Sequence, residues 1–238
     1  MDIDSTVSVL LPVCNEGEVI EKVVNDWLIQ IKTLPAGSNI LIEDANSTDG
    51  TREILQRAEF QNPQYIKVFY RDDRDGFRNA LLRLFDHSNA DYIFVADTDG
   101  QYFVTDFPYF LKRAALGNDF VKGVKINRRD GFFRRFFSYL MNRFVVVFIG
   151  LPAIDYNSSH YLIRKDFLNS IRGEGFVFKY SLNVEVTLKA LLANADYSII
   201  YVKHQSRSQG VSRGNPPLKF MAFGITTIRE IWNYKSNF

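Results

Sequence analysis

The 238-residue sequence predicts an α/β fold with a mostly parallel, doubly wound sheet. Short apolar runs alternate with helical patterns through the first half, and polar side chains follow several of these runs. Hydrophobic residues make up 46% of the chain, enough for a sizeable core. No linker divides the sequence, so we expect a single domain over residues 1–238.

The first half supplies strands and helices in alternation. Val7–Leu11 is an apolar run stopped by Pro12, and Asn15 is expected to cap a helix over Glu16–Ile31. The next strands are predicted at Ile40–Ile42, Tyr65–Tyr70, Tyr92–Ala96 and Phe120–Val124. Helices between and after them are predicted at Thr51–Ala58, Phe77–Phe85 and Asp106–Ala115.

The second half carries longer, more aromatic patterns. Helices are predicted at Phe132–Val147, Asn183–Asn194 and Leu218–Trp232, and a strand at Tyr197–Val202. Large apolar side chains beside several Arg residues favour an interfacial position for Phe132–Val147, although a core helix has the same pattern. The longest apolar run, Phe144–Ile154, is too short for a bilayer, which needs ~20 residues. We therefore expect peripheral membrane association.

Charge and cysteine content limit the partners and the compartment. The net charge of +2 predicts no general affinity for nucleic acid. Basic residues are concentrated late: seven of them against one acid from Lys122 to Arg143. The single cysteine, Cys14, excludes an intrachain disulfide framework, and the acidic N-terminus does not resemble a signal peptide. A cytoplasmic location, on the cytoplasmic face of a membrane, is expected; a homo-oligomer is compatible with the sequence.

Two carboxylates follow the strand predicted at Tyr92–Ala96. Asp97 and Asp99 are separated by one residue, and the amide of Gln101 lies nearby. In open α/β sheets, ligands bind outside the carboxyl ends of the strands. Such a group suits Mg²⁺ or Mn²⁺ bridging to phosphates. A solvated strand end is the alternative interpretation of this pattern alone.

Polar residues at two other strand ends extend this predicted crevice. Asn15 and Glu16 follow the first strand, and Asp44 follows the second, where it could bind a base or ribose. Neither a Gly-x-Gly-x-x-Gly fingerprint nor a P-loop follows the first strand. The sequence therefore favours a nucleotide diphosphate held through a metal rather than a glycine loop.

Three successive segments carry a family resemblance. Val9–Glu16, Asp44–Thr51 and Asp97–Gln101 resemble the signatures of family 2 inverting glycosyltransferases with the GT-A fold. Segments of the second half are similar to dolichyl-phosphate mannose synthases and polyprenyl-phosphate glycosyltransferases: Arg134–Asn142, Asp155–Arg164 and Arg207–Arg213. The resemblance implies transfer of a hexose from a UDP- or GDP-sugar to a polyprenyl phosphate. It also implies a nucleotide-sugar and metal-binding half, 1–125, and an acceptor-binding, membrane-associated half, 126–238.

The resemblance also implies roles for particular residues. The metal is expected at Asp97, Asp99 and Gln101, with Asp99 acting in catalysis through the charge on the diphosphate. The nucleotide is expected at Pro12, Asn15, Glu16 and Asp44. The lipid phosphate is expected at Lys125, Arg134, Ser138 and Arg207, and the three basic residues are expected to act in catalysis by holding this phosphate in line. Asp155, Glu185 and Ser212 complete the predicted substrate-binding set.

Departures from the family pattern leave the base and the sugar open. The second segment reads Asp44-Ala45-Asn46 where two adjacent acids before a glycine are usual. Arg78 stands where a small residue is common, and the later motif reads Asn157-Ser158-Ser159-His160-Tyr161.

The chemistry of the acceptor separates the remaining hypotheses. A hydroxyl acceptor needs a general base, whereas a phosphate is already ionised at neutral pH. The basic second half therefore favours a phosphate. The first alternative is a hydroxyl acceptor in polysaccharide or glycolipid synthesis, with Glu185 or Asp155 as the base. The second is a non-catalytic, membrane-associated nucleotide-binding module.

Overall fold

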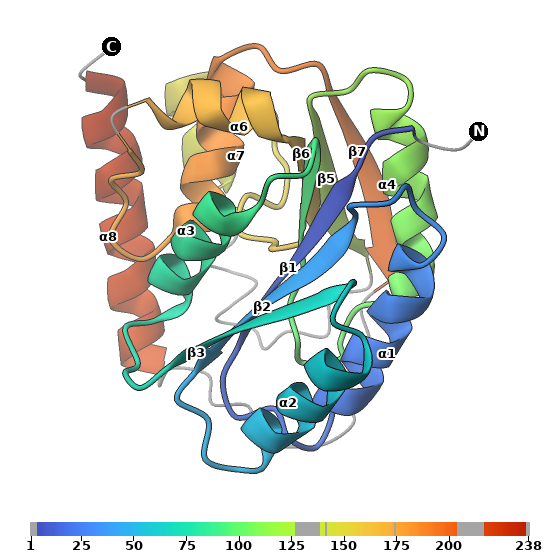
Figure 1. The fold of residues 1–238 in the computed structure, drawn as a ribbon. Helices are drawn as coiled ribbons and strands as arrows, with labels where there is room; N and C mark the ends of the chain where they lie inside the picture. The colour runs from blue at the N-terminus through green and yellow to red at the C-terminus, as the bar shows by residue number, and fades with distance from the viewer. Residues whose placement is uncertain (1–3, 127–138, 141, 174, 204–216, 237–238) are drawn as a thin grey trace.

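The centre of the molecule is a seven-stranded sheet (Figure 1). The computed structural model describes residues 4–126, 139–140, 142–173, 175–203 and 217–236. The strands are β1 (Val7–Val13), β2 (Asn39–Ala45), β3 (Ile66–Arg71), β4 (Tyr92–Val95), β5 (Phe120–Ile126), β6 (Tyr161–Arg164) and β7 (Tyr197–Lys203). Their order is β3-β2-β1-β4-β6-β5-β7. Only β6 of these strands runs antiparallel to its neighbours, β4 and β5, so the predicted mostly parallel sheet is confirmed.

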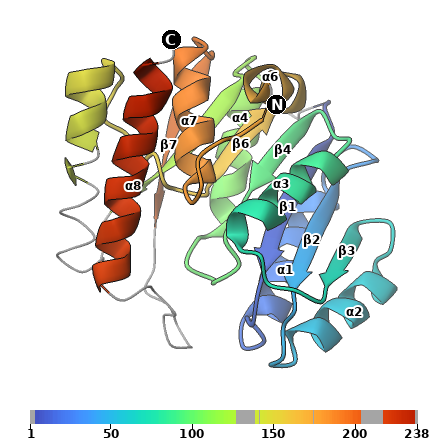
Figure 2. The same cartoon turned by 90° about the vertical axis from the view of Figure 1, so that its left-hand side faces the viewer.

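Helices cover both faces of the sheet (Figures 1 and 2). One face carries α1 (Ile20–Ile31), α2 (Thr51–Gln61) and α4 (Phe107–Ala114), the last preceded by the 3₁₀ turn η1 (Val104–Asp106). The other face carries α3 (Phe77–His87), α6 (Lys165–Arg172) and α7 (Leu182–Leu192). The π-helical turn η2 (Val145–Ile149) and α8 (Pro217–Ser236) pack against α7 from outside.

The alternation of side chains along β1 explains the two cores. Val9 and Leu11 point into the core beneath α1, whereas Leu10 points into the core beneath α3. In the first core, the ring of Phe94 lies 5.2 Å from that of Trp27 and 4.9 Å from that of Phe107, measured between centroids. Both faces of the central strands are thus buried, as their nearly continuous apolar sequence predicts.

Element boundaries differ from the predictions where loops have specific geometry. The predicted N-cap at Asn15 is wrong: α1 begins at Ile20, and Asn15 adopts a left-handed conformation with φ of 54°. The strand predicted at Ile40–Ile42 extends to Ala45, so Asp44 lies inside β2. Likewise β5 reaches Ile126, which places Lys125 inside a strand.

Two elements of the second half were not predicted. The strand β6 has only four residues and follows a polar segment, so it gives little periodic signal; α6 begins directly after it. For the predicted helix Phe132–Val147, residues 139–140 and 142–144 are helical and continue into η2. The remainder of that prediction lies outside the described residues. Within the described ranges, no helix is long and apolar enough to cross a membrane.

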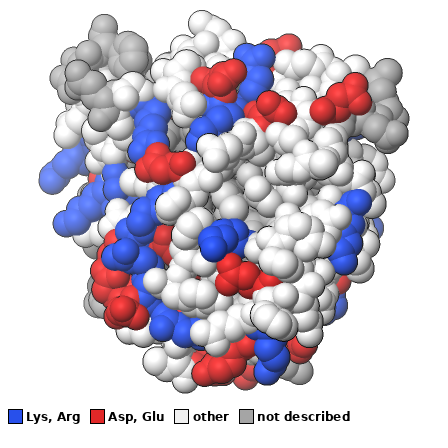
Figure 3. Space-filling view, viewed as in Figure 1, with Lys and Arg blue, Asp and Glu red and all other residues white. Residues whose placement is uncertain are grey.

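Charged side chains of both signs are intermixed on the face seen in Figure 3. Many charged side chains of the described residues are paired, among them Arg83 with Asp75 (2.6 Å) and Arg71 with Asp73 (2.9 Å). The potential of this face is therefore not dominated by one sign of charge.

Candidate active site

The fold brings most of the described predicted site residues to one edge of the sheet. β1 pairs in parallel with both β2 and β4, so the segments that follow these strands lie side by side. The last residues of these strands and the loops after them carry Pro12, Asn15, Glu16, Asp44, Asp97, Asp99 and Gln101. Lys125 lies near the carboxyl end of β5. Because β6 is antiparallel, its first residue, Tyr161, pairs with Val95 at the end of β4, which brings the preceding segment with Asp155 to the same edge.

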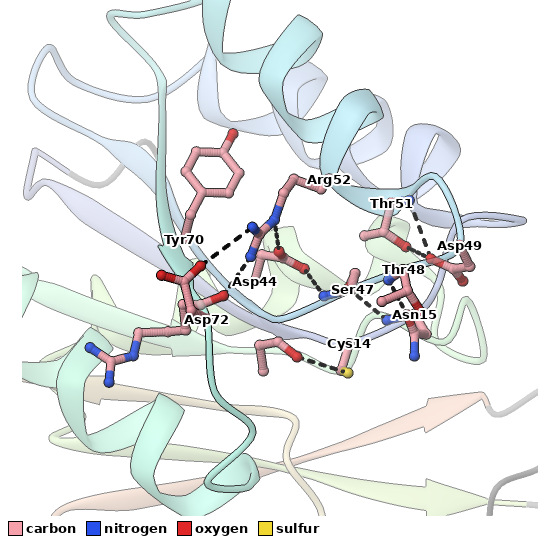
Figure 4. A network of polar contacts seen from close by, with 12 residues as sticks. Cys14, Asn15, Asp44, Ser47, Thr48, Asp49, Thr51, Arg52, Tyr70 and Asp72 are labelled. Atoms are coloured by element: carbon pink, nitrogen blue, oxygen red, sulfur yellow. Dashed lines mark hydrogen bonds and ion pairs between the residues drawn. The ribbon is translucent and has the colours of Figure 1, made fainter.

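The loops after β1 and β2 are joined by hydrogen bonds around Asn15 (Figure 4). The Asn15 amide N–H donates to Ser47 Oγ (2.8 Å), and the Thr48 amide N–H donates to Asn15 Oδ1 (2.7 Å). The left-handed conformation of Asn15 allows both bonds, and asparagine tolerates it better than most residues. Asn15 therefore connects two loops instead of capping a helix.

A second set of bonds continues this connection through Asp49. The Glu16 amide donates to Thr51 Oγ1 (2.9 Å), and the Gly17 amide donates to Asp49 Oδ2 (3.2 Å). Burial by itself would raise the pKa of the Asp49 carboxyl, but hydrogen bonds from Thr51 and Gly17 outweigh it and lower that pKa. A Cβ at Gly17 would lie 2.6 Å from the Asp49 carbonyl oxygen, so the approach requires glycine.

Asp44 is fully buried and bound on both carboxylate oxygens (Figure 4). Its Oδ1 accepts from the Ser47 amide (3.3 Å), and its Oδ2 accepts from Arg52 Nε (2.8 Å). Arg52 also donates to the Arg71 carbonyl oxygen (2.5 Å), and its guanidinium lies over the ring of Tyr70. The hydrogen bond to Asp44 is the main cause that raises the pKa of Arg52. Arg52 thus fixes Asp44 and ties the ends of β2 and β3 together.

Asp97, Asp99 and Gln101 share the short loop after β4. Gly100 turns the chain with φ of 69°, and the Gln101 amide donates to Asp99 Oδ1 (3.1 Å). Thr98 Oγ1 donates to the Pro12 carbonyl oxygen (3.3 Å), which attaches this loop to the end of β1.

The donor set of this loop fits a hard divalent cation. Asp97 and Asp99 are both half-buried, so neither residue is closed off from solvent. Across the described ranges, no group of three or more His, Cys, Asp or Glu side chains is placed to hold a metal. Two carboxylates and an amide would leave coordination positions for water and a diphosphate, as Mg²⁺ prefers.

Lys122 lies fully buried between β5 and the segment before β6. Its Nζ donates to the carbonyl oxygen of Ser158 (2.6 Å) and to Thr187 Oγ1 (3.0 Å). Burial lowers the pKa of Lys122 to about 7, although the charge of Asp155 opposes this shift. Lys122 therefore holds the segment that carries the buried Asp155 against the sheet.

Glu185 is fully buried in α7 and binds backbone rather than facing solvent. Its two oxygens accept from the amides of Val177 and Phe178 (2.8 Å each). Arg78 holds the same segment from the other side, donating to the carbonyl oxygens of Phe176 (2.5 Å) and Phe178 (2.7 Å). Both side chains fix residues 176–178 in place. This contact explains why an arginine stands at position 78, where a small residue is common in the family. The Glu185 carboxylate also pairs with the ammonium of Lys189 (3.3 Å), one turn further along α7.

Two residues that order this edge of the sheet were not predicted, and four predicted site residues lie outside the described residues. Of the predicted acceptor and substrate residues, Arg134, Ser138, Arg207 and Ser212 lie outside the described residues. Sequence reasoning missed Arg52 and Lys122. A lysine inside the apolar run Phe120–Val124 was a usable signal for the second. Arg52 directly follows the Asp44–Thr51 segment, but nothing in the sequence indicates its contact with Asp44.

The sheet order, the helices on both faces and the acidic loop after β4 define the GT-A class of fold. Solved structures of glucosyl-3-phosphoglycerate synthase from Mycobacterium tuberculosis have this fold. The complex with Mn²⁺, UDP and glucosyl-3-phosphoglycerate superposes with a TM-score of 0.69 at 18% identity, covering 92% of this chain and 76% of that one. The complex with Mn²⁺ and UDP-glucose gives a TM-score of 0.69, also at 18% identity, over 94% and 77% of the two chains.

The family model of glycosyl transferase family 2 matches residues 8–179. The chain therefore belongs to glycosyl transferase family 2. Relatives include undecaprenyl-phosphate 4-deoxy-4-formamido-L-arabinose transferases. The one from Pseudomonas fluorescens is 26% identical over 87% of this chain and 59% of its own length. The one from Photorhabdus laumondii is 29% identical over 63% and 46%. The chain thus spans about half to three fifths of the length of these relatives.

Proposed function

We propose that this chain is a metal-dependent, inverting glycosyltransferase that moves a hexose from a UDP- or GDP-sugar to a polyprenyl phosphate at a membrane surface. The observation that carries the proposal is the Asp97/Asp99 pair beside the joined loops of β1 and β2. The named activity of the undecaprenyl-phosphate relatives supports the acceptor class. Their sugar is an arabinose derivative, so the hexose rests on the resemblance noted from the sequence.

On the donor side, Asp97, Asp99 and Gln101 would hold Mg²⁺ or Mn²⁺, which would neutralise charge on the departing diphosphate. The structural neighbours bind Mn²⁺ together with UDP or UDP-glucose, which supports this assignment. The segment from Pro12 to Glu16 and Asp44 would position the nucleotide. Because Arg52 and Ser47 already fix the Asp44 carboxylate, little reorganisation is needed on binding.

On the acceptor side, Lys125 with Arg134, Ser138 and Arg207 would hold the lipid phosphate. A phosphate oxygen of the acceptor attacks the anomeric carbon, the bond from that carbon to the diphosphate breaks, and nucleoside diphosphate leaves. The acceptor is already ionised, so no general base is required. The position of Glu185, buried with both oxygens accepting backbone N–H groups, supports this route.

The membrane contact would involve η2 and α8. Phe148 and Trp232 are about half exposed, and their rings lie 6.1 Å apart between centroids. Tyr139, Leu140 and Val147 add exposed apolar surface on the adjoining turns. Aromatic side chains of this kind favour the interface between lipid headgroups and acyl chains. We assign residues 1–125 to the donor and the metal, apart from the end of β5 with Lys122 and Lys125, which adjoins the acceptor part, and residues 126–238 to the acceptor and the membrane.

A turnover assay tests the proposal. The purified chain is incubated with Mn²⁺, a panel of UDP- and GDP-sugars and a short polyprenyl phosphate in detergent, and released nucleoside diphosphate is measured. Release that requires the lipid phosphate and yields an acid-labile product is expected. Release that ignores the lipid would overturn the acceptor assignment. A panel including UDP-4-deoxy-4-formamido-L-arabinose identifies the sugar.

Two variants separate this proposal from transfer to a hydroxyl. Arg134→Ala should raise the KM for the acceptor more than the KM for the donor.

Glu185→Gln should keep turnover at a permissive temperature while lowering stability by about 1–3 kcal/mol, because glutamine presents one oxygen to two backbone donors. Loss of all turnover in a folded Glu185→Gln protein would favour a hydroxyl acceptor. Binding of nucleotide and metal with no release for any acceptor would favour a non-catalytic module.

A further inference from the structure

Lys125 is the described member of the proposed acceptor set, and its ammonium rests on an aromatic ring. Lys125 Nζ lies 5.0 Å from the ring centroid of Tyr102. This distance is within the range of about 6 Å in which a cation is attracted to the face of a ring. Lys125 is half-buried, so water weakens this attraction only in part.

The ring of Tyr102 is itself fixed from several directions. The imidazole of His160 stacks on it, with centroids 4.0 Å apart and planes within 4°. Its hydroxyl lies 3.3 Å from Ser158 Oγ. His160 in turn packs edge to face against Phe94 in the core, with centroids 5.0 Å apart. Moving the Tyr102 ring would therefore disturb the packing of β4.

The close approach of β5 to His160 depends on Gly123. The Gly123 amide donates to the His160 carbonyl oxygen (2.7 Å), and a Cβ at position 123 would lie 2.8 Å from that oxygen. Glycine thus allows β5, which carries Lys125 two residues later, to pack tightly beside the stack.

Tyr102 also belongs to the loop proposed to hold the metal, since it directly follows Gln101. One side chain therefore joins that loop after β4 to the cation on β5. The contacts that link His160, Tyr102 and Lys125 are made by side chains, whereas the ladder of the sheet is made by backbone groups.

We propose that Tyr102 is a positioning residue for the acceptor: its ring, backed by His160, holds the Lys125 ammonium where it meets the acceptor phosphate. This inference rests on the proposed function, in which Lys125 binds that phosphate. The ring acts through its π face, and the hydroxyl contacts Ser158 Oγ.

The test compares Tyr102→Leu, Tyr102→Phe, Lys125→Ala and the double variant Tyr102→Leu/Lys125→Ala. Tyr102→Leu should lower kcat/KM for polyprenyl phosphate by about tenfold, with an unchanged KM for the nucleotide-sugar. Tyr102→Phe should behave like the wild type. The double variant should be no worse than Lys125→Ala, because the ring has no effect once the ammonium is gone. Tyr109→Leu, an exposed tyrosine on α4, is the matched control.

Additive losses in the double variant, or an equal loss for donor and acceptor, would overturn the inference and leave Tyr102 with a packing role. If Tyr102→Leu does not fold, fluorinated phenylalanines at position 102 replace it, since fluorine weakens the face of the ring at nearly constant size. Acceptor kcat/KM should then fall stepwise with fluorine number, and a flat series contradicts the inference.

The same variants distinguish this failure from failure of the proposed function. If Lys125→Ala leaves the acceptor KM unchanged, Lys125 does not bind the acceptor, and the functional assignment itself is wrong. If Lys125→Ala raises that KM and Tyr102→Leu does not, the proposed binding of the acceptor by Lys125 is supported, and only the positioning role of Tyr102 is wrong.

Discussion

The two sides of the molecule that we propose bind the donor and the acceptor order their polar groups by different means. On the donor side, the loops after β1 and β2 bind each other through short-range bonds from side chain to backbone, such as Thr48 N–H to Asn15 Oδ1. Hydrogen bonds there lower the pKa of Asp49 against the effect of burial. On the acceptor side, Lys122 and Glu185 are wholly buried, and burial dominates the pKa of Lys122.

This difference predicts how substitutions on each side should affect the protein. Hydrogen bonds at half-exposed loops can be lost one at a time with modest effect, because water replaces part of each. A buried charge whose partners are removed has no such replacement and costs several kcal/mol. We therefore expect donor-side variants to change binding and catalysis, and acceptor-side core variants to change stability.

The largest expected effect tests the donor side. Asp99→Ala should lower kcat by about a thousandfold or more, because it removes the carboxylate proposed to hold the metal that stabilises the leaving diphosphate. Thermal unfolding should stay close to that of the wild type, since Asp99 is half-buried in a loop. Nucleoside diphosphate release measures the change, and Asp166→Ala, an exposed acid on α6, is the control. Unchanged turnover would remove Asp99 from the metal site.

The next effect tests the acceptor-side core through pH. Lys122 has a folded pKa of about 7, whereas an unfolded lysine titrates near about 10.4. Between these values the unfolded chain binds the proton and the folded chain does not, so stability rises with pH by up to about 1.4 kcal/mol per unit. Below about pH 7 both states hold the proton, and the cost of burying the charge is fully present.

Lys122→Met should remove this pH dependence, whatever it does to the absolute stability. Urea unfolding at several pH values between about 7 and about 10 gives the slope for each protein. The matched control is Lys67→Met, because Lys67 is a lysine of β3 with an exposed side chain. Equal slopes in the wild type and in Lys122→Met would mean that the lysine keeps an ordinary pKa in the folded chain.

A smaller effect separates the two sides in binding. Arg52→Lys should raise the donor KM by about tenfold, because lysine cannot contact Asp44 and the Arg71 carbonyl together in the geometry of the guanidinium fork. The acceptor KM should not change. Arg57→Lys, exposed on the same helix, controls for the substitution. A rise in acceptor KM alone would move Arg52 out of the donor site.

The smallest effect concerns the membrane-facing part of the acceptor side. Trp232→Ser should weaken partitioning into liposomes with anionic lipids by a few fold, on the order of 1 kcal/mol, through loss of an aromatic side chain at the interface. Flotation in a density gradient measures this. Phe60→Ser removes an exposed aromatic residue from α2, away from η2 and α8, and should leave flotation unchanged. Equal flotation for all three proteins would argue against this surface as the lipid contact.

The same contrast explains what sequence could predict. Donor-side loops directly follow strands, so the positions of Asp44 and of the Asp97 and Asp99 pair at one sheet edge were predictable from strand ends and the order of segments. The prediction for Asn15 was wrong because its side-chain oxygen can accept either from a helix N-terminus or from the Thr48 amide. Which of the two bonds forms depends on how the loops after β1 and β2 pack together.

On the acceptor side, pairings between distant segments escape local patterns. Lys122 meets Ser158 and Thr187, which lie 36 and 65 residues further along the chain. The stack of His160 on Tyr102 is equally remote in sequence. Strand β6, which brings these segments together, has too few residues to be predicted from an alternating apolar pattern.

Because β6 runs antiparallel to β4, its two ends lie at opposite edges of the sheet, one at the candidate active site and the other away from it. Its first residue meets the end of β4, and its last, Arg164, pairs with Tyr92 where β4 begins, so α6 starts from the rear of the molecule. Cys14, the single thiol, lies in the loop after β1 that we propose binds the nucleotide, so a dye attached there should respond to donor binding. Moving that thiol to the exposed Asn169 on α6 would give an attachment point for a surface or a fluorophore that leaves the reaction undisturbed.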